Sequence, residues 1–322
     1  MSALTIAVPS KGRLQEQTLA FFADCGLAIS QDGGKRGYVA RMAGQGEVDV
    51  RLLSAGDITA ALRDGDVHVG VTGEDLLREL GPAFERIVMV KPLGFGRADL
   101  VVAAPAAWLD VTTMADLDEV SAAMRARTGK RLRVATKYLK QTHAFLDGRG
   151  VDDYRIVESL GATEGAPAAG VADVIVDITT TGQTLAANHL KTLTDGLILK
   201  SQAQLAASRA ADWAPAARKI FAAILDQIEA REQGRALKLV RAAVGAAGAD
   251  ALNQLVARMG GRLASESEPG LIAFYCPAER APEASAAAAA LGAGPVGVFG
   301  SDYVFERVGT LSARFGEAIG PQ

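Results

Sequence analysis

The chain has 322 residues, of which 49% are hydrophobic and 22% are charged, the balance of a folded globular protein. This length predicts two or three lobes rather than one small core. The 34 Lys and Arg against 37 Asp and Glu give a net charge of -3. This net charge gives no reason to expect a nucleic acid as partner, so any phosphate chemistry must use local positive charge.

Cysteine, histidine and the N-terminus exclude further classes. Cys25 and Cys276 are far apart and lack CxxC spacing, so we interpret them as buried thiols in a reducing compartment. The three histidines are not spaced like paired metal ligands, which argues against a zinc site. Residues 1–9 show no basic stretch ahead of a long apolar one, and no apolar run reaches the roughly 18 residues of a membrane span. We therefore expect a cytoplasmic protein without membrane contact.

The first hundred residues alternate between short apolar runs and helical patterns. Residues 4–8 predict a buried strand, and residues 14–25 predict a helix that Gly26 ends. The alternation continues with predicted strands at 47–53, 67–71, 87–92 and 98–104 and predicted helices at 58–63 and 72–79. This order predicts a mainly parallel sheet with ligands at the carboxyl ends of its strands.

The next segment predicts a second lobe. Its predicted strands are 131–135, 154–157 and 172–178, and its predicted helices are 114–127, 138–148, 164–170 and a helix from 183 onward. Residues 197–200 are expected to return to the first lobe. We therefore assign residues 1–104 with 190–235 to lobe I, including a connecting helix at 213–232, and residues 105–189 to lobe II. Two crossings between the lobes predict a cleft that binds a small molecule.

The end of the chain changes character. Predicted strands at 237–240, 262–268, 271–275 and within 297–306 alternate with predicted helices at 249–259 and 284–291. The order βαββαβ is that of a ferredoxin-like unit. Residues 236–322 are therefore predicted to form a small third domain.

The most informative segment runs from Glu164 to Leu185. Its apolar strand carries Asp173 at the start and Asp177 near the end, and hydroxyl-rich residues follow before a predicted helix. A helix N-terminus offers free N–H groups, and a glycine in the turn lets backbone amides approach an anion closely. We interpret the segment as a loop that binds a phosphate monoester, with the acids facing ribose hydroxyls or Mg2+. The binding residues assigned to it are Glu164, Thr179, Thr180, Thr181, Gly182, Gln183, Thr184 and Leu185.

The residues alone leave ordinary structural explanations open. Threonines and a glycine before a helix are also what a plain N-cap requires, and acids at strand ends can cap the following turn. The cations in turns, which are Lys11, Arg13, Arg97 and Lys137, could simply be solvated.

Across Glu164–Leu185 the sequence resembles the signature of the ATP phosphoribosyltransferases, which open histidine biosynthesis. The matching positions are Glu164, Gly170, Ala172, Ile175, Asp177, Ile178, Thr181, Gly182, Thr184 and Leu185. Segments 9–14, 70–75, 93–96 and 135–138 resemble further family motifs in the expected order. The resemblance covers roughly residues 4–200 and extends more weakly to the rest.

Two positions depart from the family pattern. Ser54 stands where the family often has Arg, and Leu139-Lys140 stand where it usually has Pro-Asn. These departures concern the details of nucleotide binding and not the class of reaction.

The resemblance implies an α/β fold with a two-lobed catalytic core of the periplasmic-binding-protein-like (type II) kind, followed by the ferredoxin-like domain. It implies a pentosyltransferase that moves phosphoribosyl from phosphoribosyl pyrophosphate to N1 of ATP, giving phosphoribosyl-ATP and pyrophosphate in the first step of L-histidine biosynthesis. Adenine N1 already has a lone pair, so a basic catalytic side chain is not required. Cations and Mg2+ should instead stabilise the departing pyrophosphate, and acids the ribose.

Roles follow residue by residue from the resemblance. Lys11, Arg13 and Arg97 are assigned to pyrophosphate or ATP phosphates, and the 179–185 loop to the 5′-phosphate. Asp173 and Asp177 are assigned to ribose hydroxyls or Mg2+, and either is a candidate metal ligand. Asp57, Gly73 and Asp75 are assigned to the nucleotide side. The residues named as catalytic are Lys11, Arg13, Asp173 and Asp177.

The resemblance also implies feedback inhibition by histidine and a homo-oligomer, either a dimer or a hexamer. Two arrangements stay open: residues 237–322 bind histidine, or a separate subunit like histidyl-tRNA synthetase is needed.

Two other functions remain as alternatives. A non-catalytic two-lobed small-molecule-binding module would carry an export signal or a fused transporter, and a partner-dependent paralogue would have an eroded phosphate loop. The sequence shows neither feature. A P-loop kinase is disfavoured because no GxxxxGK[ST] occurs.

Overall fold

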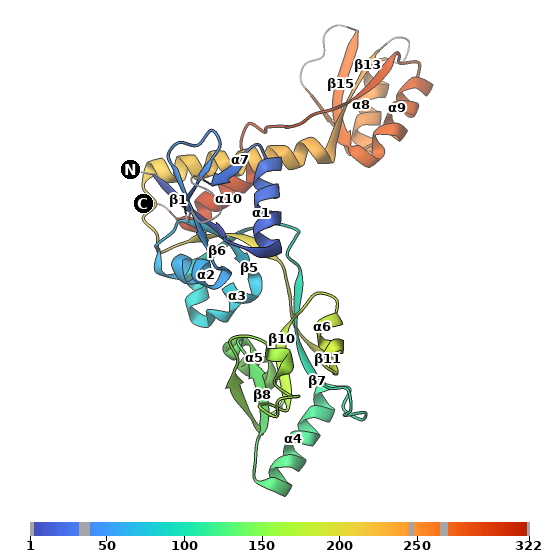
Figure 1. Cartoon of the computed structure of the whole chain (residues 1–322). Helices are drawn as coiled ribbons and strands as arrows, with labels where there is room; N and C mark the ends of the chain where they lie inside the picture. Colours follow the sequence, from blue (N-terminus) through green and yellow to red (C-terminus); the bar gives the residue numbers. More distant parts are fainter. Residues whose placement is uncertain (1–2, 32–38, 245–247, 265–269, 321–322) are drawn as a thin grey trace. The chain divides into compact units, whose positions relative to one another are not determined.

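The computed structural model describes residues 3–31, 39–244, 248–264 and 270–320. One compact unit comprises the chain up to Phe21 together with Ile29–Ala214, and the other comprises Phe22–Ala28 together with the chain from Pro215 onward. The first unit contains a seven-stranded and a five-stranded sheet, and the second contains a four-stranded sheet (Figure 1).

The seven-stranded sheet has the order β2-β3-β4-β1-β5-β12-β6. Its central strands β4, β1 and β5 are parallel, whereas β2, β3, β12 and β6 each pair antiparallel with their neighbours. The sheet is therefore mixed, and the expected mainly parallel sheet is wrong outside this centre. The strand bounds are β1 Leu4–Pro9, β2 Ile29–Gln31, β3 Val39–Met42, β4 Val48–Leu53, β5 Val69–Gly73, β6 Ile87–Pro92 and β12 Ala203–Ser208.

Three helices and a 3-10 turn accompany this sheet: α1 Gly12–Asp24, α2 Ala55–Asp64, α3 Glu74–Glu79 and the turn Gly81–Arg86. Ser54 is the N-cap of α2, since its hydroxyl accepts the Asp57 N–H at 3.2 Å and donates to the Asp57 carboxylate at 2.6 Å. The helix ends at Gly65, whose φ of 84° is left-handed. Ser54, the first departure from the family pattern, therefore caps the N-terminus of α2.

The five-stranded sheet has the order β11-β7-β10-β8-β9. Its strands β9, β8 and β10 are parallel, β7 pairs antiparallel with β10, and β11 pairs antiparallel with β7. The bounds are β7 Ala98–Pro105, β8 Leu132–Thr136, β9 Tyr154–Glu158, β10 Val174–Thr179, β11 Leu190–Ser201, α4 Met114–Thr128, α5 Leu139–Gly148 and α6 Gln183–Ala187. The predicted helix at 164–170 is a 3-10 turn, Thr163–Gly165, followed by further turns, because glycine and proline interrupt a longer helix there.

Both sheets of the first unit repeat one arrangement: three parallel strands, then an antiparallel strand, then one more. In each sheet the antiparallel strand arrives from the other sheet, β7 after residues 93–97 and β12 after Gln202. This is the two-lobed, periplasmic-binding-protein-like (type II) fold. The strands at 98–105 and 190–201 pair in the second sheet, so the lobe boundaries lie at these crossings and not at 104 and 189, and residues 197–200 do not return to lobe I.

A buried hydrogen-bonded group joins the two lobes. The Tyr138 hydroxyl from lobe II donates to the Asp75 carboxylate of α3 at 2.6 Å, and the Ser201 hydroxyl donates to the same carboxylate at 2.8 Å. Lys140 adds two contacts, since its N–H donates to Glu79 Oε1 at 2.8 Å and its ammonium to the Leu80 carbonyl at 2.7 Å. The second departure from the family pattern therefore lies in an interlobe contact.

The second unit contains the predicted ferredoxin-like fold. Strand order β14-β15-β13-β16, all antiparallel, with α8 and α9 in the connections, confirms the βαββαβ prediction. The predicted strand 262–268 is β14 only at its start, and residues 265–268 lie outside the described residues. The bounds are α7 Pro215–Ala236, β13 Leu237–Ala243, α8 Ala249–Arg258, β14 Arg262–Leu263, β15 Leu271–Pro277, the 3-10 turn Ala278–Arg280, α9 Ala281–Ala290, β16 Val296–Gly300 and α10 Thr310–Ile319.

The last helix, α10, was not predicted. It packs on α7 rather than on the ferredoxin-like sheet, with the Phe315 and Phe221 rings 4.7 Å apart in a T-shaped contact. Both cysteines are buried free thiols as expected, and burial raises the pKa of Cys25 to about 11. In the part of the chain that the structure describes, no helix combines the length and apolar content of a bilayer crossing.

Candidate functional site

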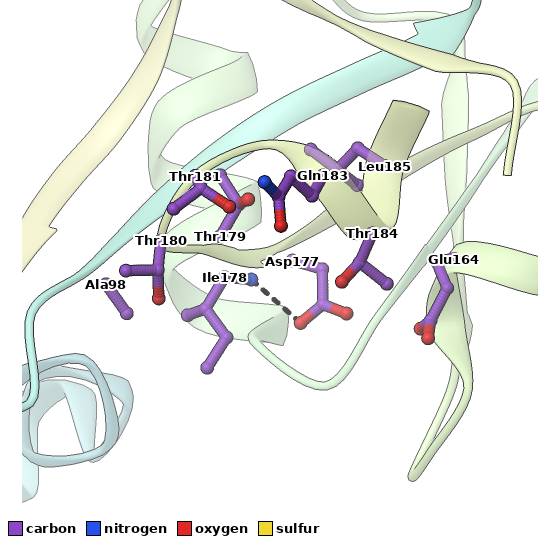
Figure 2. Close-up of a pocket in the computed structure, with 10 residues that line it drawn as sticks. All are labelled: Ala98, Glu164, Asp177, Ile178, Thr179, Thr180, Thr181, Gln183, Thr184 and Leu185. Carbon is purple, nitrogen blue, oxygen red and sulfur yellow. Dashed lines mark hydrogen bonds between the residues drawn. The ribbon is translucent and has the colours of Figure 1, made fainter. Parts of the chain in front are cut away.

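The predicted phosphate loop lines a small polar cavity of about 260 Å³ at the carboxyl end of β10 (Figure 2). Four pieces of lobe II supply its wall: the first residue of β7, the turn that carries Glu164, the last residues of β10, and the loop that follows together with the start of α6. The structure therefore brings together nearly the whole predicted set. The lining residues are Ala98, Glu164, Asp177, Ile178, Thr179, Thr180, Thr181, Gln183, Thr184 and Leu185.

Internal hydrogen bonds hold the loop in shape. Gly182, at a φ of 74°, donates its N–H to Thr179 Oγ1 at 2.9 Å, and Thr180 Oγ1 donates to the Arg97 carbonyl at 3.3 Å. Within the described residues, the exposed hydroxyls of Thr181 and Thr184 have no protein partner. The five residues of α6 give only a small dipole, so the groups that this loop offers to an anion are its own N–H and hydroxyl groups.

Asp177 is the acid at the centre of this cavity. Burial raises the pKa of its carboxyl above the ordinary value. The carboxylate accepts the Ile178 N–H at 2.8 Å, and this hydrogen bond and the charge of Lys137 lower the pKa in part. The negative charges of Glu164 and Asp75 raise it further. Figure 2 shows Thr184 lying between Asp177 and Glu164. A carboxylate that burial and neighbouring acids destabilise is one that a cationic ligand stabilises.

A second, larger cavity of about 670 Å³ adjoins the first. Ala98, Ile178 and Thr180 line both cavities, so the two cavities share one wall. Three cations line the larger cavity, Arg13, Arg97 and Lys137, beside apolar side chains. The remaining lining residues are Leu14, Gln17, Ala55, Gly73, Asp75, Leu76, Gly94, Phe95 and Gly96.

The apolar part of this wall was not assigned from the sequence. Leu14 and Phe95 lie within two of the family-like motifs, but such residues read as core in a single sequence. In the structure they give the larger cavity a surface on which a flat aromatic ligand can pack, next to cations that suit its phosphates.

Asp173 lies away from the loop. It precedes β10 whereas the loop follows it, and six strand residues span roughly 20 Å. Arg133 holds its carboxylate by an ion pair at 2.8 Å and by its backbone N–H at 2.8 Å. Burial raises the pKa of Asp173, but these hydrogen bonds outweigh it and the pKa lies below its ordinary value. The expectation that Asp173 shares a site with Asp177 is wrong.

Other predicted residues are dispersed. Lys11 is exposed just before α1 and lines neither cavity, and Asp57 is exposed and bound to Ser54. Asp75 lines the larger cavity, but Tyr138 and Ser201 occupy its carboxylate. Gly73 also lines it, and a Cβ there would lie 2.2 Å from Asp75 Oδ1, so only glycine fits.

The described residues contain no group of three or more His, Cys, Asp or Glu side chains that could hold a metal ion. The polar cavity does bring two carboxylates to one wall, those of Asp177 and Glu164. Mg2+ is commonly held by one or two carboxylates plus substrate phosphates, so this donor set fits a magnesium–phosphate ligand. Asp173 does not fit, because Arg133 already neutralises it.

Comparison with known proteins identifies the family of this chain. A family model described as ATP phosphoribosyltransferase matches residues 54–230. The chain is 53% identical over 321 residues to the ATP phosphoribosyltransferase of Caulobacter vibrioides, covering 98% of each chain. It is 49% identical over 318 residues to that of Bradyrhizobium diazoefficiens, again covering 98% of each.

A solved structure supports the fold. An ATP phosphoribosyl transferase (HisG:HisZ) complex from Thermotoga maritima contains a chain that is 23% identical to this one, with a TM-score of 0.52. The match covers 70% of this chain and 96% of that chain. At this identity the likeness concerns the fold alone.

Proposed function

The chain belongs to the ATP phosphoribosyltransferase family, and from that premise we propose that its two adjoining cavities bind the two substrates of this reaction. The chain is a pentosyltransferase of histidine biosynthesis that joins phosphoribosyl to N1 of ATP and releases pyrophosphate. We assign phosphoribosyl pyrophosphate to the polar cavity and the nucleotide to the larger one. The shared wall of Ala98, Ile178 and Thr180 carries this assignment, because it lets two separately bound ligands meet.

The polar cavity has groups suited to both the phosphate and the ribose of the sugar phosphate. The Thr181 and Thr184 hydroxyls and the N–H groups that begin α6 would hold the 5′-phosphate. Asp177 and Glu164 would face the ribose hydroxyls, where their negative charge stabilises the positive charge that develops on the sugar as pyrophosphate departs.

The larger cavity suits ATP. Leu14, Leu76 and Phe95 would pack against adenine, and Arg13, Arg97 and Lys137 would stabilise the negative charge of pyrophosphate and of the ATP phosphates. Because adenine N1 has a free lone pair, the protein's contribution is orientation and electrostatics. Orientation alone can supply about 7–11 kcal/mol of the barrier.

We also propose Mg2+ as the cofactor. Asp177 and Glu164 would hold it together with substrate oxygens, and its charge would neutralise the departing pyrophosphate. The raised pKa of Asp177 supports this assignment, since a bound cation favours the ionised carboxylate.

The test is substrate-specific. Purified full chain with ATP, phosphoribosyl pyrophosphate and Mg2+ should yield phosphoribosyl-ATP and pyrophosphate. Thr181→Ala should raise the KM for phosphoribosyl pyrophosphate roughly tenfold, as expected for one lost hydrogen bond to a charged group, and leave the KM for ATP nearly unchanged. Equal losses for both substrates would contradict the assignment of the two cavities.

Regulation and assembly are further proposals. We propose a cytoplasmic homo-oligomer, dimer or hexamer, that histidine inhibits. The structure from Thermotoga maritima is named as a HisG:HisZ complex, which supports a separate subunit as the alternative location of the histidine site. Histidine added to the full chain alone decides between the two arrangements: inhibition assigns the site to this chain, and its absence assigns it to a partner subunit.

The non-catalytic alternative has less support. A two-lobed fold suits a binding module equally well, but near-full-length relatives at about half identity are named as the enzyme.

A further inference from the structure

A third cavity of about 690 Å³ lies in lobe II at the opposite end of β10. Cations from four pieces of structure line it: the last turn of α4, the loop after it, β8 and β9. They are Arg125, Arg127, Lys130, Arg131, Arg133 and Arg155. A chain whose net charge is -3 therefore gathers six cations in one place.

Few acids neutralise this cluster. Asp173 is bound by Arg133, and Asp153 lies 3.8 Å from Arg125 and 4.0 Å from Arg131, at the outer limit of an ion pair. Six cations against these two carboxylates leave four positive charges. Among the described residues, no hydrogen bond or ion pair engages the side chains of Arg127, Lys130 or Arg155.

The sheet register brings two of these cations side by side. Arg133 of β8 and Arg155 of β9 are direct neighbours in the parallel pairing. Like charges placed opposite each other on neighbouring strands repel. A helix dipole favours cations in the last turn of α4, which accounts for Arg125 and Arg127, but the other four lie outside the helix.

We propose that this cavity is a second anion site, separate from the substrate cavities, and that it binds the phosphate chain of a small di- or triphosphate. The guanidinium groups of Arg127 on α4 and Arg155 on β9, with the Lys130 ammonium, can contact several phosphate oxygens at once, which favours a chain of phosphates over a single carboxylate. Met124 and Thr128 add a small uncharged edge. None of the residues of this cavity lines a substrate cavity, so the proposed anion site can be tested independently of the proposed reaction.

The experiment is a calorimetric titration of the full chain with inorganic pyrophosphate, without Mg2+. The variant Arg127→Gln/Lys130→Gln/Arg155→Gln removes the unengaged cations and leaves Arg133, which holds Asp173, in place. The matched control Arg241→Gln/Arg307→Gln/Arg314→Gln removes the same charge from exposed arginines of the second unit.

We expect the first variant to lose one pyrophosphate site per chain, or to bind there at least about tenfold more weakly, and the control to bind like wild type. Arg127→Lys/Arg155→Lys, which keeps the charge, should retain part of the affinity. Competition between ATP and pyrophosphate at this site shows which kind of ligand it prefers. Equal affinities indicate a site for free polyphosphate, whereas a much higher affinity for ATP indicates a site for a nucleotide.

Three outcomes would overturn the inference. The first variant could keep all pyrophosphate sites at unchanged affinity. The control variant could lose as much pyrophosphate affinity as the first variant. A single-stranded DNA oligonucleotide could also displace pyrophosphate with an affinity that rises with its length, which would make the cluster a nucleic-acid surface.

Discussion

The two ends of strand β10 look alike in sequence and differ in chemistry. Each end has an aspartate, Asp173 before the strand and Asp177 near its close, and each adjoins a left-handed glycine, Gly170 or Gly182. At the first end an arginine neutralises the acid and the pKa falls; at the second, burial and neighbouring acids raise it. An acid in an ion pair stabilises the fold, whereas one held in a polar cavity without an ion-pair partner costs stability and is available to a ligand.

The largest expected effect separates the two aspartates by activity. Asp177→Asn should lower kcat/KM for phosphoribosyl transfer about 10²–10³-fold, because it removes negative charge from the site where positive charge develops. Asp173→Asn should leave kcat/KM close to wild type. Steady-state assays with both substrates varied measure this, and a comparable loss in both variants would mean that Asp173 acts in the reaction.

The two glycines offer a matched pair. Gly182 and Gly170 have φ of 74° and 70°, and an added Cβ at either meets no atom within 4 Å. Valine should therefore cost each a similar 1–2 kcal/mol of backbone strain, at about the level known for left-handed residues. Gly182→Val should also raise the KM for phosphoribosyl pyrophosphate, by up to about 100-fold, since the loop that positions the phosphate shifts. If Gly170→Val raises that KM equally, the effect belongs to strain and not to the site.

A smaller effect separates the aspartates by stability. At neutral pH, Asp173→Asn should lower the free energy of unfolding by about 1–2 kcal/mol, because it breaks a partly buried ion pair. Asp177→Asn should raise it, because the neutral side chain escapes the cost of a buried charge. Urea unfolding of both variants beside wild type measures the difference, and losses of the same sign would contradict the contrast between the two ends.

The pH dependence gives the finest test. The folded pKa of Asp173 is lowered, so its contribution is present above the ordinary value of about 3.9 and is lost as pH falls through the folded pKa. The folded pKa of Asp177 is raised, so its cost is full above that raised pKa and disappears as pH falls to about 3.9. The stabilisation by Asp177→Asn should therefore fade at a higher pH than the destabilisation by Asp173→Asn, as urea unfolding at stepped pH would show.

The sequence was sufficient for elements whose signals are local. The βαββαβ order of the last domain and the loop around Gly182 follow from spacing and turn residues within short windows. The location of β7 and β11 could not be predicted in this way, because which sheet a strand joins depends on distant partners. α10 was missed although it pairs with α7, since its few apolar positions show no signal until the partner is known.

The same limit applies to the site. The predicted strand already has Asp173 at its start and Asp177 near its end, but nothing local shows that an arginine neutralises only the first. The side chain that decides their roles, Arg133, is forty residues away in the chain. Leu14 and Phe95 show the converse: their place in the cavity depends on contacts across the lobe boundary, whereas their sequence signal is that of ordinary core.

The wall formed by Ala98, Ile178 and Thr180 has a thermodynamic consequence. Ligands that touch the same side chains cannot bind independently, so the affinity of each depends on whether the other is present. Reciprocity then requires that the factor by which the sugar phosphate changes the affinity for the nucleotide equals the factor for the reverse. For the two substrates as proposed, a side chain in that wall such as Ile178 therefore contributes to one coupling energy that belongs to the pair and to neither ligand alone.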